Sequence, residues 1–142
     1  MQVEPATERI FNGAKSLMVK TFPYLTEGNV DEILRVCAKN DGLLFPPIDG
    51  PDFLFAYWRF WPKLIELVKN GEWGDLERED LRKGPILYVA ALICRPGPKS
   101  NYSVMRELVA ILNPFGVAIH RYKHGEFEFH FKRNTRFDKA RF

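Results

Sequence analysis

The chain has few of the residues that build disulfide frameworks and metal centres. Only two of its 142 residues are cysteine, Cys37 and Cys94. They are too few for a disulfide framework and too isolated for a thiolate metal site, so we expect buried thiols in a reducing compartment. No apolar run approaches the roughly 18 to 20 residues of a membrane span. The stretch around Glu4, Pro5 and Glu8 lacks the basic and apolar regions of a signal peptide, so we expect a cytoplasmic rather than a secreted protein.

Catalytic and metal-binding motifs are also scarce. The chain has no Gly-x-Ser-x-Gly sequence, no phosphate-loop consensus and no Cys/His pair at a recognisable catalytic spacing. Three histidines, His120, His124 and His130, lie within eleven residues. A hairpin over this segment places His120 and His130 on opposite faces and His124 in the turn, so their side chains do not converge. We therefore expect no metal site.

What the chain does have is the composition of one globular domain spanning residues 1–142. Apolar residues make up 46% and charged residues 27%. The net charge of +3 is uneven, because residues 119–142 hold seven Lys and Arg against three acids. A basic end of this kind attracts phosphates of a nucleic acid, nucleotide or cofactor, although a solvated tail has the same composition.

The first half of the chain is predicted to be mainly helical. Apolar residues at helical spacing predict helices over Thr7–Val19 and Asp31–Lys39. Pro62 is best tolerated in a first helical turn, so we expect a third helix over Pro62–Lys69, with Trp61 on its buried side.

The segment Phe53–Trp61 carries six aromatic residues in nine positions. This pattern fits neither a helical stripe nor an alternating strand, so the sequence leaves its conformation open. Aromatic residues at this density form the core between helices and sheet, line an apolar ligand pocket, or form an exposed patch that binds a protein partner.

The second half gives a clearer pattern. Ile86–Cys94 is uncharged over nine residues, which predicts a central strand covered on both faces. An amphipathic helix follows over Asn101–Leu112, with Ile111 on its buried side. Strands over Val117–Lys123 and Glu126–Lys132 then form a hairpin. Its register places opposite charges on one face and aromatic residues on the other.

The hairpin aromatics Phe127, Phe129 and Phe131 are expected to point into the core. The whole pattern predicts an α+β domain in which N-terminal helices pack on a small mixed sheet, with a C-terminal strand-helix-β-hairpin. The charged segment Trp73–Lys83 is predicted to be a solvated connection, unless one of Asp75, Glu77, Glu79 or Asp80 acts as a general base at the mouth of a pocket.

The loop between the central strand and the next helix carries the best chemical signal. It reads Arg95-Pro96-Gly97-Pro98-Lys99-Ser100-Asn101. Free backbone N–H groups at a helix N-terminus bind phosphate, and Arg95 and Lys99 add positive charge. A plain strand-to-helix loop with solvated cations has the same sequence character.

The last 60 residues or so resemble the GNAT family of N-acetyltransferases, and in particular small GNAT-like proteins encoded by tailed bacteriophages. The resemblance is carried by Val104–Leu108, Phe115-Gly116, Tyr122 and the Gly125-Glu126-Phe127 turn followed by Phe129. The chain departs from the family's pattern at the pyrophosphate loop, where two prolines remove two backbone amides. It also shows no β-hairpin before the central strand.

The resemblance implies acetyl-CoA or another acyl-CoA as cofactor and an amine as acceptor. The cofactor pyrophosphate would then be held at Arg95, Gly97, Lys99, Ser100 and Asn101. Tyr102 would be the general acid that protonates the leaving thiolate. A carboxylate of the charged segment, Glu77 in our assignment, would be the base.

Two other functions remain open on the sequence. A non-catalytic GNAT-like protein of a phage virion, or one that contacts a host protein, would use the Phe53–Trp61 segment as its docking surface. A phage-encoded chain would lie in the host cytoplasm or in the virion. Nucleic-acid binding would use the basic C-terminal hairpin and tail, but we do not expect it, because core aromatics cannot stack on bases.

Overall fold

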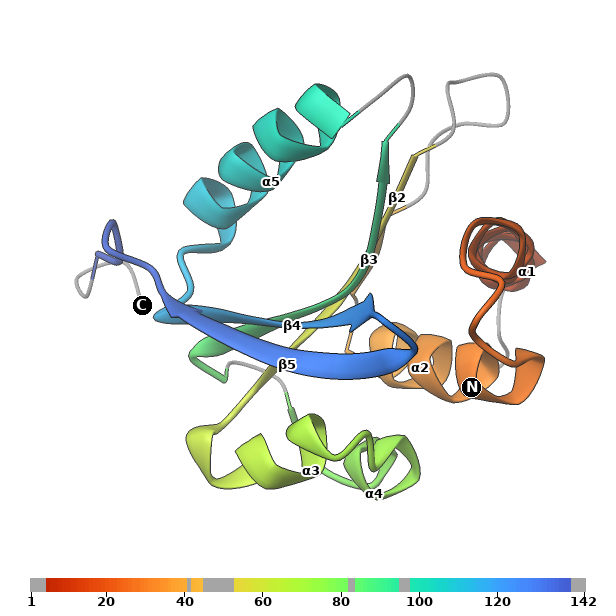
Figure 1. Cartoon of the computed structure of the whole chain (residues 1–142), viewed down its shortest axis with the longest axis horizontal. Helices are drawn as coiled ribbons and strands as arrows, with labels where there is room; N and C mark the ends of the chain where they lie inside the picture. The colour runs from red at the N-terminus through yellow and green to blue at the C-terminus, as the bar shows by residue number, and fades with distance from the viewer. Residues whose placement is uncertain (1–4, 41, 45–52, 82–83, 95–97, 139–142) are drawn as a thin grey trace.

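The computed structural model describes residues 5–40, 42–44, 53–81, 84–94 and 98–138 (Figure 1). These residues form an α+β fold in which helices surround one five-stranded mixed sheet. The elements are α1 (Pro5–Thr21), α2 (Glu27–Lys39), β1 (Leu43–Leu44), β2 (Phe53–Phe60), a 3-10 turn (Pro62–Leu64), α3 (Ile65–Lys69), α4 (Trp73–Glu77), β3 (Ile86–Cys94), α5 (Pro98–Leu112), β4 (Gly116–Lys123) and β5 (Glu126–Arg133).

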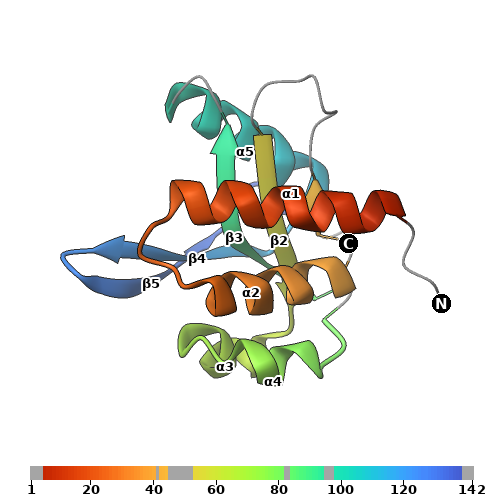
Figure 2. The same ribbon diagram turned by 90° about the vertical axis from the view of Figure 1, so that its right-hand side faces the viewer.

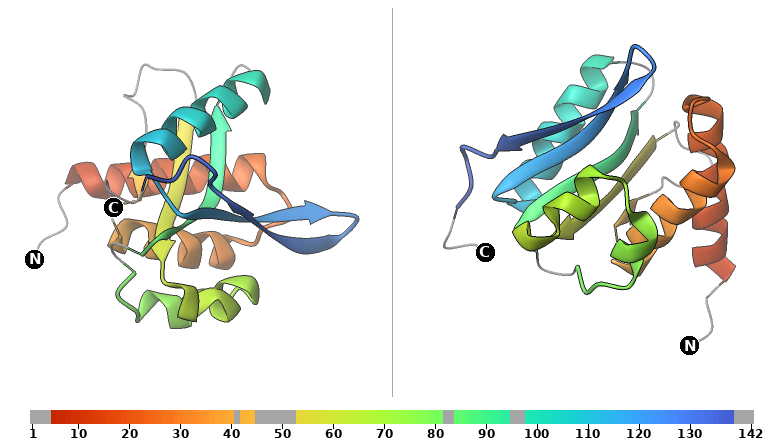
Figure 3. Two further views of the ribbon diagram at one scale, coloured as in Figure 1. Left: turned by 90° about the vertical axis from the view of Figure 1, so that its left-hand side faces the viewer. Right: turned by 60° about the horizontal axis from the view of Figure 1, so that its bottom comes forward.

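The strands lie in their sequence order, β1 to β5, and only β3 and β4 run parallel. Helices α1 and α2 cross one face of β2 and β3, and α5 covers the other face (Figures 1 and 2). The short helices α3 and α4 lie beside α2 at one end of the sheet (Figure 3). None of the helices in the described ranges is long and apolar enough to cross a bilayer.

The aromatic segment that the sequence left open is the strand β2. Leu54, Phe55, Ala56, Trp58 and Phe60 are all fully buried, because helices cover both faces of this strand. Burial on both faces also explains why the segment shows no alternation of apolar and polar residues. The described part of the segment is therefore core, and among its described aromatic side chains only Trp61, 38% exposed, is a large exposed side chain. The prediction that Trp61 is buried is wrong.

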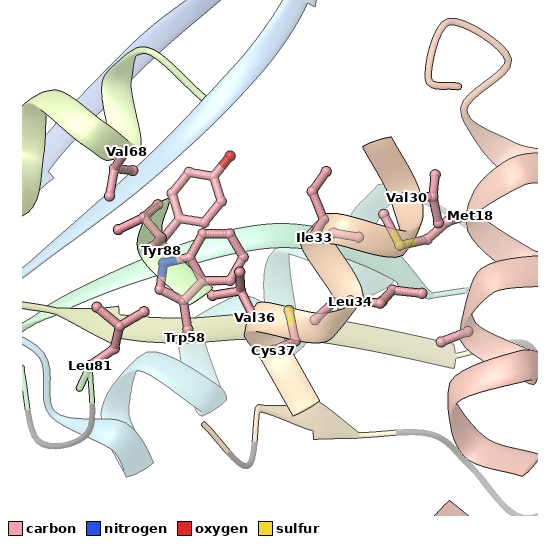
Figure 4. Close-up of a cluster of buried hydrophobic side chains, with 14 of the residues drawn as sticks. Met18, Val30, Ile33, Leu34, Val36, Cys37, Trp58, Val68, Leu81 and Tyr88 are labelled. Atoms are coloured by element: carbon pink, nitrogen blue, oxygen red, sulfur yellow. The ribbon is translucent and has the colours of Figure 1, made fainter. Parts of the chain in front are cut away.

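Strand β3 is the central strand that the sequence predicts, with the same bounds. Tyr88 packs in the cluster under α1 and α2, whereas Leu87 and Val89 pack under α5. In Figure 4 the ring of Tyr88 lies beside the Trp58 indole, and Cys37 lies in the same cluster. Burial raises the pKa of the Cys37 thiol, as expected for an inert thiol.

Two helices differ from their predictions. Helix α5 begins at Pro98, so Lys99, Ser100 and Asn101 belong to its first turn and not to a preceding loop. Ile111 is 69% exposed, because α5 packs through Met105, Leu108, Val109 and Leu112 instead.

The charged connection contains α4, which is anchored by the buried Leu76. An antiparallel strand pair, β1 with β2, does precede the central strand, contrary to the sequence reading.

The predicted hairpin is confirmed in its register. Lys123 pairs with Glu126, Tyr122 with Phe127, Arg121 with Glu128 and His120 with Phe129. The turn residues His124 and Gly125 both have positive φ, which suits a two-residue hairpin turn.

The predicted burial of the hairpin aromatics is only partly right. Phe129 packs against the main core, but Phe127 is 50% exposed and Phe131 is 43% exposed. All three residues share one face of β5, and no helix among the described residues covers the outer part of that face.

Candidate functional site

The two parallel strands of the sheet separate after only four residue pairs. β3 pairs with β4 from Ile86 opposite Gly116 to Val89 opposite Ile119. A bulge coincides with the end of this pairing, because Tyr57 of β2 lies opposite Val89 while Ala56 lies opposite Ala91. The intervening residue, Ala90, has no partner in β2, and such a bulge bends its strand. Within the described residues, β3 has no strand partner on its β4 side beyond Val89.

A cavity of about 570 Å³ lies at this divergence. Its wall is formed by Tyr88–Leu92 of β3 and Ile119–Arg121 of β4, with Met105 of α5, the α1–α2 connection and the α3–α4 connection completing it. The volume lies within the range of small-molecule sites. The cavity is therefore lined from both sides of the sheet, by α5 on one side and by the α1–α2 connection on the other.

Two polar side chains of the cavity wall are hydrogen bonded to each other. The Tyr88 hydroxyl lies 2.8 Å from His120 Nδ1, and His120 Nε2 lies 2.9 Å from the Lys69 carbonyl oxygen. A carbonyl only accepts, so Nε2 carries the proton and the neutral ring accepts at Nδ1 from the Tyr88 hydroxyl. We call these two residues the Tyr88–His120 pair.

The environment holds both members of the pair in their neutral forms. Burial is the main cause that lowers the pKa of His120; the Lys69 carbonyl opposes it and nearby His130 adds to it. Burial also raises the pKa of the Tyr88 hydroxyl. At neutral pH the pair is therefore an uncharged donor and acceptor at the cavity wall, and His120 has a free capacity to accept a proton.

Aromatic residues from two distant segments close one side of the cavity. Tyr24 of the α1–α2 connection stacks on Tyr122 of β4, with ring centroids 4.2 Å apart and planes 6° from parallel. Tyr24 also contacts Phe127 edge-on at 5.8 Å. Phe22, Tyr24 and Phe127 line the cavity. The contact joins the N-terminal helices to the hairpin tip and covers the cavity with apolar surface.

The charged side chains that line the cavity are both basic. Lys69 and Arg121 belong to the lining, and among the described residues no Asp or Glu does. The wall therefore disfavours a ligand that carries several positive charges.

The structure separates the predicted catalytic residues. Glu77 ends α4, forms an ion pair with Arg35 at 3.5 Å and does not line the cavity. Its carbonyl accepts a hydrogen bond from Lys39. Tyr102 belongs to α5, one turn before the cavity residue Met105. Because α4 packs on α2 and α5 packs on the opposite face of the sheet, Glu77 and Tyr102 are not brought together.

The predicted cofactor residues fall in two places. Lys99, Ser100 and Asn101 lie in the first turn of α5, directly after the central strand and its loop. Arg95 and Gly97 lie outside the described residues. Of the predicted phosphate site the structure therefore describes only the backbone of residues 98–101, at the start of α5.

The sequence reading missed the Tyr88–His120 pair. On the sequence alone His120 is considered only as a metal ligand, and the confirmed register places it opposite Phe129 and His130 opposite Ile119, on different faces. The available signal was its place among aromatic residues on the inner face of the hairpin, where a polar ring needs a partner.

No family model matches this chain, and neither the curated proteins nor the solved structures contain a match to it.

The lowered pKa of His120 gives a pH-dependent stability. In the unfolded chain His120 titrates near its ordinary value of 6.5, whereas in the folded chain it takes up a proton only at lower pH. The unfolded state thus binds more protons between these values, so the free energy of unfolding falls as the pH drops below about 6.5.

When the pH is lowered from 7.5 to 5, we expect the free energy of unfolding to fall less for His120→Gln than for the natural chain. Urea unfolding followed by circular dichroism at both pH values measures the difference. Equal losses in the two proteins would show that His120 is protonated as readily in the folded chain as in the unfolded chain.

Proposed function

We propose that the chain is a GNAT-like acyltransferase that transfers an acyl group from acyl-CoA to an amine, with the acyl-CoA bound in the cavity between β3 and β4. The observation that carries the proposal is the separation of two parallel strands beside the helix that connects them. Strand, helix and hairpin follow in the order that the family resemblance implies.

The cavity suits the chemistry of the cofactor arm. The pantetheine arm of CoA is a narrow, extended chain with two amide groups. The edge of β3 beyond Val89 offers backbone N–H and C=O groups to such amides, as a sheet edge does to an added strand. Ala90 and Ala91 are small, so the backbone there is open to a ligand.

The start of α5 suits the cofactor phosphates. The first N–H groups of a helix have no partner within it, and the helix dipole favours an anion there. Pro98 occupies the first helical position, where a missing N–H costs nothing, so the amides of Lys99, Ser100 and Asn101 supply this role. Pro98, one of the two prolines that depart from the family's loop, is thus compatible with a phosphate site.

The Tyr88–His120 pair supplies the proton transfer. The acceptor nitrogen attacks the thioester carbonyl carbon, and its N–H proton passes to the Tyr88 oxygen while the Tyr88 proton passes to His120 Nδ1. The Lys69 carbonyl stabilises the imidazolium that forms. The C–S bond then breaks, and the same proton returns through Tyr88 to the leaving sulfur. In this scheme the pair replaces Glu77 as the base, and Tyr102 remains an alternative acid.

The cavity wall also restricts the acceptor. Lys69 and Arg121 disfavour a polyamine, and the aromatic cover of Phe22, Tyr24 and Phe127 favours an amine attached to an apolar or aromatic group.

The exposed residues of β5 both favour and oppose the alternative function, nucleic-acid binding. Phe127 and Phe131 are exposed and therefore able to stack on bases, but Glu126 and Glu128 alternate with them and repel phosphate.

Acetyl-CoA is expected to stabilise the fold. At a hundred times its dissociation constant it adds about 2.7 kcal/mol, which raises the Tm by several degrees. Lys99→Glu places a negative charge in the first turn of α5 and is expected to remove most of the shift. Lys20→Glu, the same change at the exposed end of α1, is the matched control and keeps it. A natural chain whose Tm does not move in millimolar acetyl-CoA or free CoA would refute the proposal.

A further inference from the structure

Strand β5 is an open edge of the sheet. It pairs with β4 along its whole length, and its other side has no strand partner among the residues that the structure describes. Seven of its eight residues are exposed, and only Phe129 is half-buried. In Figure 3 β5 lies on the outer side of the hairpin, with β4 between it and β3.

This edge lacks most of the features that usually protect an edge strand. Natural edges are blocked by proline, bulges, short strands, covering elements or charged side chains, and among the described residues β5 has only the charged side chains, Glu126, Glu128, Lys132 and Arg133. β5 is eight residues long, contains no proline and pairs with β4 without a register shift. It also exposes Phe127 and Phe131, so it has both unpaired backbone groups and apolar side chains on its surface.

The sequence of β5 is complementary to itself in an antiparallel arrangement. When two copies pair with Phe129 opposite Phe129, Glu126 lies opposite Lys132, Glu128 lies opposite His130 and Phe127 lies opposite Phe131. On one face Glu126 then meets the opposite charge of Lys132 and Glu128 meets the His130 imidazole, and on the other face aromatic rings meet; pairs of these kinds stabilise neighbouring strands.

Other arrangements match less well. A parallel pair places each glutamate opposite its own copy. An antiparallel pair centred on Glu128 brings the two Glu128 side chains together, and one centred on His130 leaves Glu126 without a basic partner. Registers shifted by a single residue are excluded, because they place groups bonded to β4 opposite groups that point outward.

We propose that β5 is a homodimer interface, in which the β5 strands of two copies pair antiparallel with Phe129 on the two-fold axis and join the two sheets into one. The partner that fits this edge is therefore a second copy of the chain. The proposal is independent of the proposed acyltransferase activity, because it rests on the edge and its charge pattern alone.

The dimer has a consequence for the cavity. Phe127 belongs both to the cavity wall and to the dimer edge, and Phe131 of the partner subunit lies opposite it in the proposed register. The partner subunit therefore covers the exposed half of Phe127 next to the aromatic side of the cavity.

The size of the interface sets the expected affinity. Standard interfaces use about 20–30 residues a side, and β5 offers far fewer. We therefore expect a dimer with a dissociation constant in the micromolar range, seen as a concentration-dependent rise in mass.

The test uses two charge reversals that are each unfavourable alone and complementary together. Glu126→Lys places lysine opposite Lys132, and Lys132→Glu places glutamate opposite Glu126, so each variant is expected to dimerise at least tenfold more weakly than the natural chain. An equimolar mixture restores both opposite-charge pairs and is expected to dimerise again. Glu107→Lys, an exposed residue of α5, is the matched control and keeps the natural affinity.

Sedimentation velocity from low to high micromolar concentration measures all five samples, and circular dichroism confirms that each variant is folded. A natural chain that stays monomeric throughout overturns the proposal. A dimer that both variants still form, or that the mixture of variants fails to restore, overturns the register. A monomer that instead binds a single-stranded oligonucleotide would assign the edge to nucleic acid.

Discussion

Replacing Trp58 with alanine is expected to lower the free energy of unfolding by about 3–5 kcal/mol. The indole is fully buried between the sheet and α2, contacts Tyr88 at 4.4 Å and meets Trp73 edge-on at 5.5 Å between ring centroids. Truncation therefore removes a large apolar surface and leaves a cavity that these neighbours cannot fill. Urea unfolding followed by far-ultraviolet circular dichroism measures the loss.

The chain carries its own control for this prediction. Trp61 is the same residue type three positions later, but it is 38% exposed, so Trp61→Ala is expected to cost less than about 1 kcal/mol. Similar losses in the two variants would contradict the difference in burial. Trp58→Phe is expected to lose much less than Trp58→Ala. Among the described residues the buried Nε1 of Trp58 has no hydrogen-bond partner, so phenylalanine also removes the cost of that unsatisfied donor.

The predictable parts of the fold are those with a local pattern. Ile86–Cys94 is uncharged between glycine and proline signals, and the hairpin register follows from charge pairs that are directly opposite. The Phe53–Phe60 strand was ambiguous because both of its faces are buried, which erases the alternation that identifies a strand. Helix α4 was missed because it is five residues long and a single residue, Leu76, is buried in it.

The site depends on contacts that no local pattern encodes. Tyr88 belongs to an uncharged run and is indistinguishable there from a core residue. Its partner His120 lies 32 residues later, and the two meet because α5 returns the chain to make β4 parallel to β3. No spacing distinguishes Glu77 from the other acids of its cluster, and its carboxylate pairs with Arg35. The site therefore could not be predicted from the sequence, because it depends on the long-range parallel pairing of β3 with β4.

Replacing His120 with glutamine is expected to slow acyl transfer by about 10²–10⁴-fold without weakening acetyl-CoA binding. Glutamine keeps a hydrogen-bonding side chain beside Tyr88 and Lys69 but cannot take up a proton. Release of the CoA thiol, measured with a panel of apolar and aromatic primary amines, gives the rate, and the Tm shift with acetyl-CoA gives the binding. Tyr88→Phe interrupts the same proton path, so the double variant is expected to be no slower than the slower single variant.

The pH profile distinguishes a catalytic role of His120 from a structural one. Since burial lowers the pKa of His120, the neutral base persists below pH 6.5, and the rate is expected to fall only at a lower pH than a free histidine would give. His124→Gln is the matched control, because His124 lies exposed in the turn of the same hairpin and is not among the groups that lower the pKa of His120. If His120→Gln kept both the natural rate and the natural pH profile, the Tyr88–His120 pair would be a structural contact, and the proton acceptor would lie elsewhere on the cavity wall.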